Sequence, residues 1–124
     1  MKIYKNDSDD LGFAYTCLFS QAVNLSEFKK WAEKIVLEVD DCPDYIFELI
    51  DFEGEIYKMN EAIGFSPSWD HDINDEYALI GLAYKRGVEV YDSPISKKNA
   101  LEVLHKNIGI EDRFKSSFPF IAFG

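Results

Sequence analysis

The sequence predicts an all-α fold, an irregular globular bundle of about six helices in a single domain over residues 1–124. Apolar residues recur at helical spacing in several segments, and Gly or Pro follows most of these segments. The chain is 47% hydrophobic and 15% aromatic, which is enough apolar material for a packed core. The one expected exception is a short extended segment at 88–91, where apolar and polar residues alternate.

Two helices are predicted at the start of the chain, at residues 11–22 and 25–39. Asp9 is placed to cap the first helix, which is broadly apolar. Asn24 followed by Glu27 fits a capping box for the second helix. Apolar side chains then recur with the helical period at Leu25, Phe28, Ala32, Ile35, Val36 and Val39.

Two shorter helices are predicted next, at residues 43–52 and 55–62. Pro43 suits the first turn of the earlier helix, and Gly64 follows the end of the later one. The inner stripe of the first is Ile46, Leu49 and Ile50, with Glu48 and Asp51 turned outward, and the inner stripe of the second is Ile56, Met59 and Ile63. Phe47 and Phe52 widen the apolar side of the first helix and are predicted to lie in the core.

A helix around residues 77–84 is predicted to be the buried centre of the fold, because it is apolar on almost every side. Acidic residues precede it, and Lys85 and Arg86 follow it, which suits the dipole of the helix. Gly87 is placed to end the helix in a left-handed cap.

The last predicted helix spans residues 97–107, with Ser96 as its cap. Its inward side chains are predicted to be Ala100, Leu101, Leu104 and Ile108. Pro119 argues against a helix in the aromatic stretch that follows. This stretch, residues 114–124, is predicted to be a tail held on the core by Phe118, Phe120, Ile121 and Phe123.

Charge is distributed unevenly along the chain, whose net charge is −10. Residues 38–76 hold thirteen acids and one base, Lys58, so this segment alone carries −12. The acids are Glu38, Asp40, Asp41, Asp44, Glu48, Asp51, Glu53, Glu55, Glu61, Asp70, Asp72, Asp75 and Glu76. Such asymmetry favours a basic partner and disfavours nucleic acid and anionic membranes, which would repel the chain. A solvated face that only maintains solubility is the alternative interpretation.

No motif predicts catalysis, a cofactor or a metal. The segment from Asp70 to Glu76 begins like a calcium loop, but Asp75 stands where the loop needs Gly and Gly81 where it needs Glu. The acids before the central helix are therefore interpreted as helix caps. His71 and His105 lack metal-ligand spacing, and the two cysteines, one of them Cys17 in an apolar helix, predict reduced thiols.

Aromatic residues lie among the acids, a combination that suits a protein interface because aromatics supply contact energy and charges supply steering. Trp69 stands in a loop between Ser68 and Asp70 and is predicted to be an exposed anchor. The predicted partner-binding residues are Asp40, Asp41, Asp44, Asp51, Glu53, Glu55, Trp69, Asp70, Asp72, Asp75 and Glu76.

Three blocks, DYIFELIDF, IGFSPSWD and EYALIGLAYKRGVEVY, resemble bacterial immunity proteins, the small acidic partners of contact-dependent growth inhibition toxins. The resemblance covers roughly residues 13–123 and rests on apolar blocks and chain size. It implies a non-catalytic cytoplasmic protein that binds a toxin domain, often a basic nuclease, and blocks its active site. No residue list is transferred from that family.

The sequence is also compatible with two other functions. One is a small metal-dependent enzyme or regulator that uses Asp70, His71 and Asp72, and the other is an acidic adaptor for a different basic protein. The N-terminus has no apolar stretch typical of a signal peptide, and no apolar run is long enough to cross a membrane. A cytoplasmic location is therefore expected, while the oligomeric state is left open.

Overall fold

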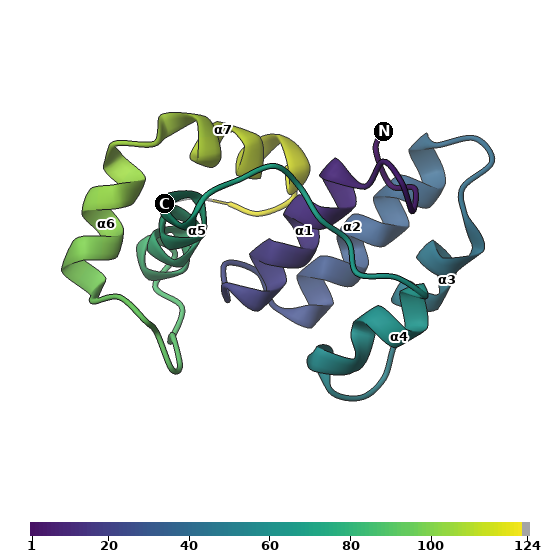
Figure 1. Ribbon diagram of the computed structural model, residues 1–124, viewed down its shortest axis with the longest axis horizontal. Coiled ribbons are helices and arrows are strands. Elements are labelled where there is room, and N and C mark those ends of the chain that lie inside the picture. Colours follow the sequence, from purple (N-terminus) through teal and green to yellow (C-terminus); the bar gives the residue numbers. More distant parts are fainter. Residues whose placement is uncertain (123–124) are drawn as a thin grey trace. The chain divides into compact units, whose positions relative to one another are not determined.

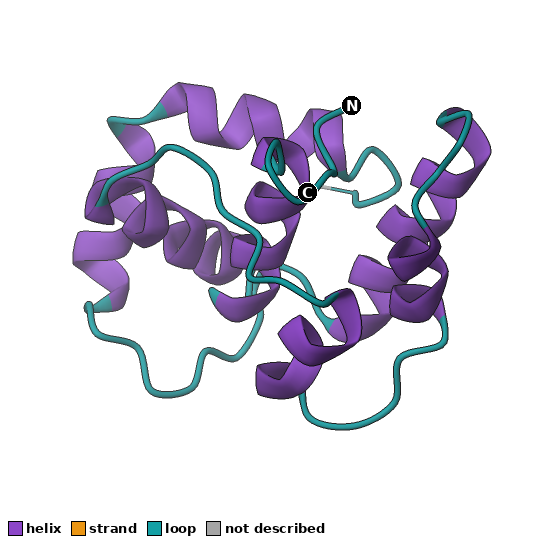
Figure 2. Cartoon of the chain, turned by 45° about the vertical axis from the view of Figure 1, so that its right-hand side comes forward, coloured by secondary structure: helices purple, strands orange, loops and turns teal. Residues whose placement is uncertain are grey.

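The computed structural model describes residues 1–122, and among these it contains seven α-helices, one 3-10 helix and no β-strand. Figure 1 shows the succession of helices, and Figure 2 shows that loops make all the connections between them. The all-α prediction is therefore confirmed. Segment 88–91, expected to be extended, forms no strand in the structure.

The chain divides into two compact units, each of which has its own core. The first unit comprises residues 1–15 and 25–70, and the second comprises residues 16–24 and 71–124. Helix α1 (Asp9–Phe19) contributes its first part to one unit and its last part to the other. The single domain expected over residues 1–124 stays a prediction.

In the first unit, α2 (Leu25–Glu38) packs against α3 (Asp44–Ile50). The helical period predicted the inner face of α2 correctly, because Phe28, Ala32 and Ile35 are buried. Trp31 completes this face, with its ring stacked on Phe28 at a centroid distance of 5.7 Å. The N-terminal residues also belong to this core, since Ile3 is fully buried and the Tyr45 hydroxyl donates a hydrogen bond to its carbonyl oxygen.

The expected fourth helix consists of two pieces, a 3-10 turn η1 (Ile56–Lys58) and α4 (Met59–Ile63). Gly64 ends α4 with φ of +90°, a conformation that favours glycine. In α3, Ile46 and Leu49 are buried as predicted. The prediction for Phe47 was wrong, since the side chain is 47% exposed. Phe52 is half-buried, so the core placement predicted for it holds only in part.

The second unit is built around α5 (Ile73–Lys85), which packs along α6 (Lys97–His105) (Figure 1). Every residue from Ala78 to Ala83 is buried, which confirms that this helix is a core element. Gly87 has φ of +76° and follows the end of α5 as predicted. Ser96 caps α6 by accepting a hydrogen bond from the Asn99 N–H at 3.2 Å, also as predicted.

The end of the chain differs most from the prediction. The last helix was predicted to end at residue 107, and residues 114–124 were predicted to be a tail held on the core, but residues 108–117 form a seventh α-helix, α7 (Ile108–Ser117). Ile108 was expected to face inward but is 69% exposed. Phe118 is buried and Phe120 is exposed, so only the first of these two aromatics is a core anchor. Ile121 is half-buried, and Phe123 lies outside the described residues.

The corner after α1 shows how segment 88–91 is held without a partner strand. The Gln21 side-chain amide donates to the Tyr91 carbonyl oxygen at 2.7 Å, and its oxygen accepts from the Tyr91 N–H at 2.8 Å. A single amide side chain therefore makes both hydrogen bonds that a neighbouring strand would offer at this residue.

Candidate functional site

The acidic segment of the first unit forms a bend between α3 and α4. Helix α3 buries Ile46 and Leu49, and its two acids, Asp44 and Glu48, are exposed. Asp51 ends the helix, and Gly54 turns the chain with φ of +124°, a conformation that side-chain-bearing residues rarely adopt. Glu55 is extended and precedes η1. The bend therefore brings the acids of two short helices around one depression.

This depression, called here the acidic hollow, has a volume of about 380 Å³. Five of its nine lining residues are acidic, and one is basic. The lining residues are Glu48, Asp51, Phe52, Glu53, Gly54, Glu55, Lys58, Glu61 and Ala62. A concave surface dominated by carboxylates attracts cationic groups more strongly than the same charges on a flat surface, because its low-dielectric walls focus the field.

Aromatic groups lie beside these acids. Phe52 is part of the wall of the acidic hollow and is half-buried. Tyr57 is 63% exposed, and the Lys58 ammonium lies 5.8 Å from the centre of its ring. A hydrogen bond with the Glu55 side chain raises the pKa of the Tyr57 hydroxyl above its ordinary value. The region thus offers a cation both carboxylates and an aromatic face.

The acidic hollow contains three of the predicted binding residues, Asp51, Glu53 and Glu55. It also contains Glu48 and Glu61, two acids of the segment 38–76 that were not among the predicted binding residues. The position of these two residues in the hollow depends on the packing of α3 against α4, which the sequence did not predict. Four other predicted acids are exposed in the same unit but do not line the hollow: Asp40, Asp41, Asp44 and Asp70.

The remaining predicted acids belong to the second unit, where they organise the start of α5. The Asp72 side chain accepts a hydrogen bond from the Asp75 N–H at 3.0 Å, and Asp75 accepts in return from the Asp72 N–H at 3.1 Å. These reciprocal bonds form a capping box, which confirms the helix-cap interpretation. Glu76 lies 3.3 Å from the His71 imidazole.

The prediction that Trp69 is an exposed anchor was wrong. Its side chain is only 9% exposed and packs edge-on against Phe13, with ring centroids 5.1 Å apart. The physical reason is a clamp on the preceding residue. The Ser68 N–H donates to the Ser8 hydroxyl at 3.1 Å, and that hydroxyl donates to the Ser68 carbonyl at 3.2 Å. Trp69 is thereby turned into the core.

Among residues 1–122, no three His, Cys, Asp or Glu side chains are grouped so that they could hold a metal ion. In the segment from Asp70 to Asp72, the Asp72 carboxylate is engaged with the backbone of α5. The geometry therefore gives the metal-dependent alternative no specific support.

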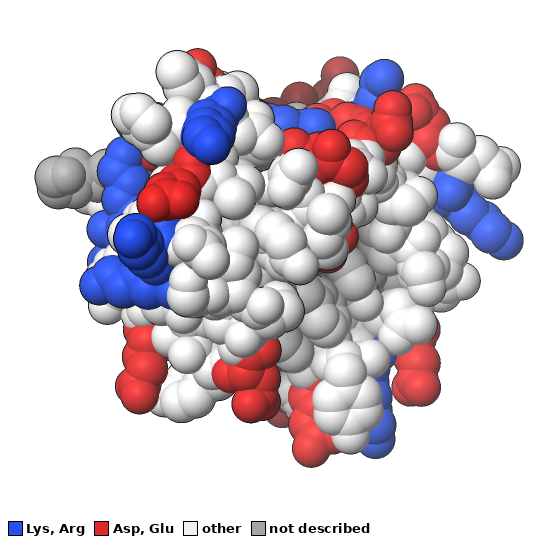
Figure 3. Space-filling model, turned by 60° about the vertical axis from the view of Figure 1, so that its left-hand side comes forward, with Lys and Arg blue, Asp and Glu red and all other residues white. Residues whose placement is uncertain are grey.

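Net charge separates sharply between the two units. The first unit contains 15 acids and 6 bases, which gives −9, and the second contains 8 acids and 7 bases, which gives −1. On the face shown in Figure 3, Lys and Arg side chains gather in clusters with acidic side chains beside them. Nearly all of the excess negative charge therefore belongs to the first unit.

Comparison of the chain with models of protein families, with curated proteins and with solved structures gave no match. Among the described residues, no helix has both the length and the apolar character needed to cross a membrane.

Proposed function

We propose that the protein is a cytoplasmic immunity protein whose acidic hollow binds a basic cognate toxin domain, such as a nuclease. The observation that carries the proposal is the acidic hollow itself, in which five carboxylates surround a depression on the unit that holds −9 of the net charge. The resemblance of the apolar blocks to toxin immunity proteins supports the same assignment.

The physical chemistry of nucleases supports this pairing. A nuclease cleft must be positive in order to bind a polyanion, so a negative, concave surface on an inhibitor is complementary to it. Long-range attraction also raises the association rate, which can reach about 10⁸–10⁹ M⁻¹s⁻¹ at low salt. Rapid capture is valuable when the free toxin is lethal.

The test measures binding to the product of the neighbouring upstream gene, by calorimetry and by association kinetics at rising salt. The variant Asp51→Lys, Glu53→Lys, Glu55→Lys reverses three lining charges of the acidic hollow. The matched control Glu89→Lys, Glu102→Lys, Asp112→Lys makes the same charge change at exposed positions of the second unit.

The hollow variant is expected to weaken binding by at least about 100-fold, mainly through slower association and with a smaller dependence on salt. The control variant should lose about threefold or less, through the general change in net charge. Equal losses in the two variants would contradict the assignment of the site. A wild-type protein that does not bind the toxin but binds another basic protein would instead be an adaptor.

A further inference from the structure

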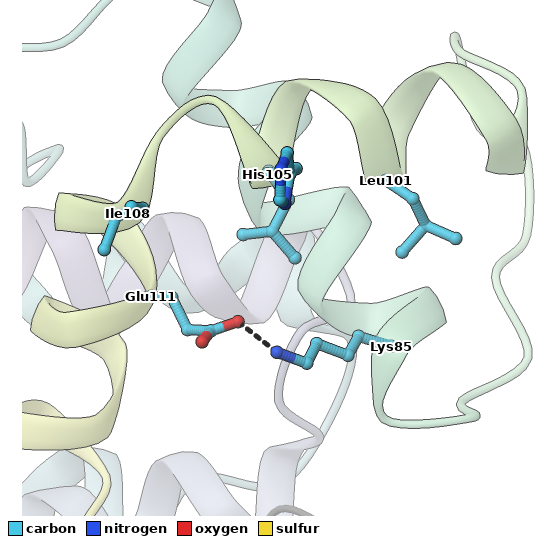
Figure 4. A pocket seen from close by; sticks show the side chains of 6 residues that line it. Lys85, Leu101, His105, Ile108 and Glu111 are labelled. Carbon is cyan, nitrogen blue, oxygen red and sulfur yellow. Dashed lines mark hydrogen bonds and ion pairs between the residues drawn. The ribbon is translucent and has the colours of Figure 1, made fainter.

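A second depression lies on the second unit, where α6 meets α7 (Figure 4). Its volume is about 270 Å³. It is lined by Lys85, Leu101, Leu104, His105, Ile108 and Glu111. Leu101, Leu104 and His105 follow the helical spacing i, i+3, i+4 on α6, and Ile108, the first residue of α7, lines the same depression. Ile108 is 69% exposed at this depression.

The size of this depression indicates what it can accept. Sites for small molecules are usually about 300–1,000 Å³, so this one is too small to enclose a typical ligand. It suits a single large side chain, the kind of anchor that dominates protein interfaces. Because Leu101, Leu104 and Ile108 supply the apolar part of the lining, that side chain is expected to be apolar.

The charged residues around this depression favour an occupant that has acidic neighbours. The Lys85 ammonium lies 2.6 Å from one Glu111 carboxylate oxygen, and the Lys115 ammonium lies 3.3 Å from the other, so the two cations and Glu111 together leave one positive charge. The exposed residues Lys97 and Lys98 lie one helical turn before Leu101, and His105 is exposed on the same face of α6. The matching occupant is therefore an apolar side chain that has carboxylates beside it.

The chain itself carries such a side chain on its first unit. Phe47 is 47% exposed on α3, although large aromatic residues are more often buried. Asp44 and Asp51 stand three residues before and four residues after Phe47, so they neighbour it on the helix surface, and Glu48 is adjacent in sequence. All three acids are exposed.

We propose that the depression at Ile108 binds Phe47 of a second copy of this chain, with the acids around Phe47 facing the basic rim. The contact joins the first unit of one copy to the second unit of another. This contact does not depend on the proposed function, but it would affect binding at the acidic hollow. Asp51 lines the acidic hollow, so a copy engaged in this way has that site partly covered and should compete with a basic partner for it.

Sedimentation velocity of the purified protein from about 10 μM to about 1 mM tests the contact, since interfaces of this small size associate weakly. The wild type should sediment faster as its concentration rises. Ile108→Asp and Phe47→Lys should each remain monomeric, because each removes one half of the contact. An equimolar mixture of the two variants should associate again, since one keeps the depression and the other keeps Phe47.

Ile73→Asp is the matched control, because Ile73 is an exposed isoleucine at the start of α5 that does not line the depression. It should associate like the wild type. Equal urea midpoints for all variants would show that none acts by unfolding, as expected for exposed positions. A wild type that is monomeric throughout, variants that associate normally, a mixture that stays monomeric, or loss of association in the Ile73 control would each overturn the proposal.

Discussion

Gly81 of α5 lies directly against the backbone of Ala100 in α6. A Cβ atom added to Gly81 would sit 2.5 Å from the Ala100 carbonyl oxygen and 3.0 Å from the Leu104 Cβ atom. The first of these distances is far below ordinary van der Waals contact, and the atom it meets belongs to a helix backbone. The closest approach of the two helices in the second unit therefore requires a residue without a side chain.

Gly81→Ala is expected to destabilise the protein by about 1–2 kcal/mol. Forcing a methyl group into a packed core costs about 1–3 kcal/mol, and alanine recovers up to about 1 kcal/mol through its better helix propensity. Gly109→Ala is the control, because Gly109 lies in α7 with no atom near its Cβ position and should gain up to about 1 kcal/mol. Urea unfolding of the two variants measures both values. A stabilised Gly81→Ala protein would show that α5 and α6 are not packed this closely.

The Asp75 carboxylate joins the start of α5 to the junction between α6 and α7. One oxygen accepts from the Asp72 N–H at 3.1 Å, and the other accepts from the Asn107 side-chain amide at 2.8 Å. We expect Asp75→Ala to cost about 1–2 kcal/mol, and Asn107→Ala about 1 kcal/mol. The double variant should cost less than the sum, because both single changes remove the same bond. Asn74→Ala, at an exposed neighbouring position, should change stability by less than about 0.5 kcal/mol.

This arrangement also affects how binding experiments are interpreted. Charge reversal at Asp72 or Asp75 removes part of a capping box, so any loss of partner binding would be confounded by loss of stability. Asp51, Glu53 and Glu55 line an open depression and are exposed. Substitutions at these three positions therefore leave the capping box of α5 intact.

Local signals predicted the elements whose determinants lie within a few residues of each other. The helical period predicted α2, the unbroken apolar run predicted the buried part of α5, and Ser96 predicted the start of α6. Helix α7 was missed because Asn107 was assigned to the end of the preceding helix, whereas in the structure it precedes the first residue of α7 and makes no side-chain cap. What stabilises α7 is tertiary packing, with Phe114 fully buried and its ring 5.1 Å from that of Phe118.

Only the acidic character of the candidate site was predicted, because that prediction rested on the count of charged residues. The count placed an acidic surface between residues 38 and 76, and three of the selected acids do line the acidic hollow. The charge count could not show that Ser68 is hydrogen-bonded to Ser8, since the two residues are 60 positions apart in the sequence. This contact turns Trp69, which was predicted to be exposed, into the core. In the seven-residue helix α3, apolar residues occur on several sides, so the period could not separate Phe47 from the true inner stripe.

The two cysteines are expected to differ in reactivity. Burial raises the pKa of the fully buried Cys17 thiol well above its ordinary value, and the nearby Arg113 charge only partly offsets this. Burial also raises the pKa of the Cys42 thiol, which is only half-buried. Because the thiolate is the reactive form, a disulfide reagent at about pH 8 should modify Cys42 first. In a Cys42→Ser protein, the remaining thiol should react only as fast as the protein unfolds. Rapid modification of Cys17 in the native protein would contradict its burial.

Glu111 is expected to make stability depend on pH in the acidic range. Its hydrogen bond to Lys85 is the main factor that lowers the pKa of its carboxyl group below the ordinary 4.5, with Lys115 acting in the same direction and burial opposing both. A lowered pKa in the folded state means that the contribution to stability is fully present above about pH 4.5. It is lost as the pH falls through the lower pKa that the carboxyl group has in the folded state.

The free energy of unfolding of the wild type should therefore exceed that of Glu111→Gln at pH 7, and this difference should shrink steadily below about pH 4.5. Glu102→Gln removes the same charge at an exposed position of α6 and serves as the control for the general effect of losing one carboxylate. A difference between wild type and Glu111→Gln that is constant from pH 7 to pH 3 would mean that the ion pairs of Glu111 do not stabilise the fold.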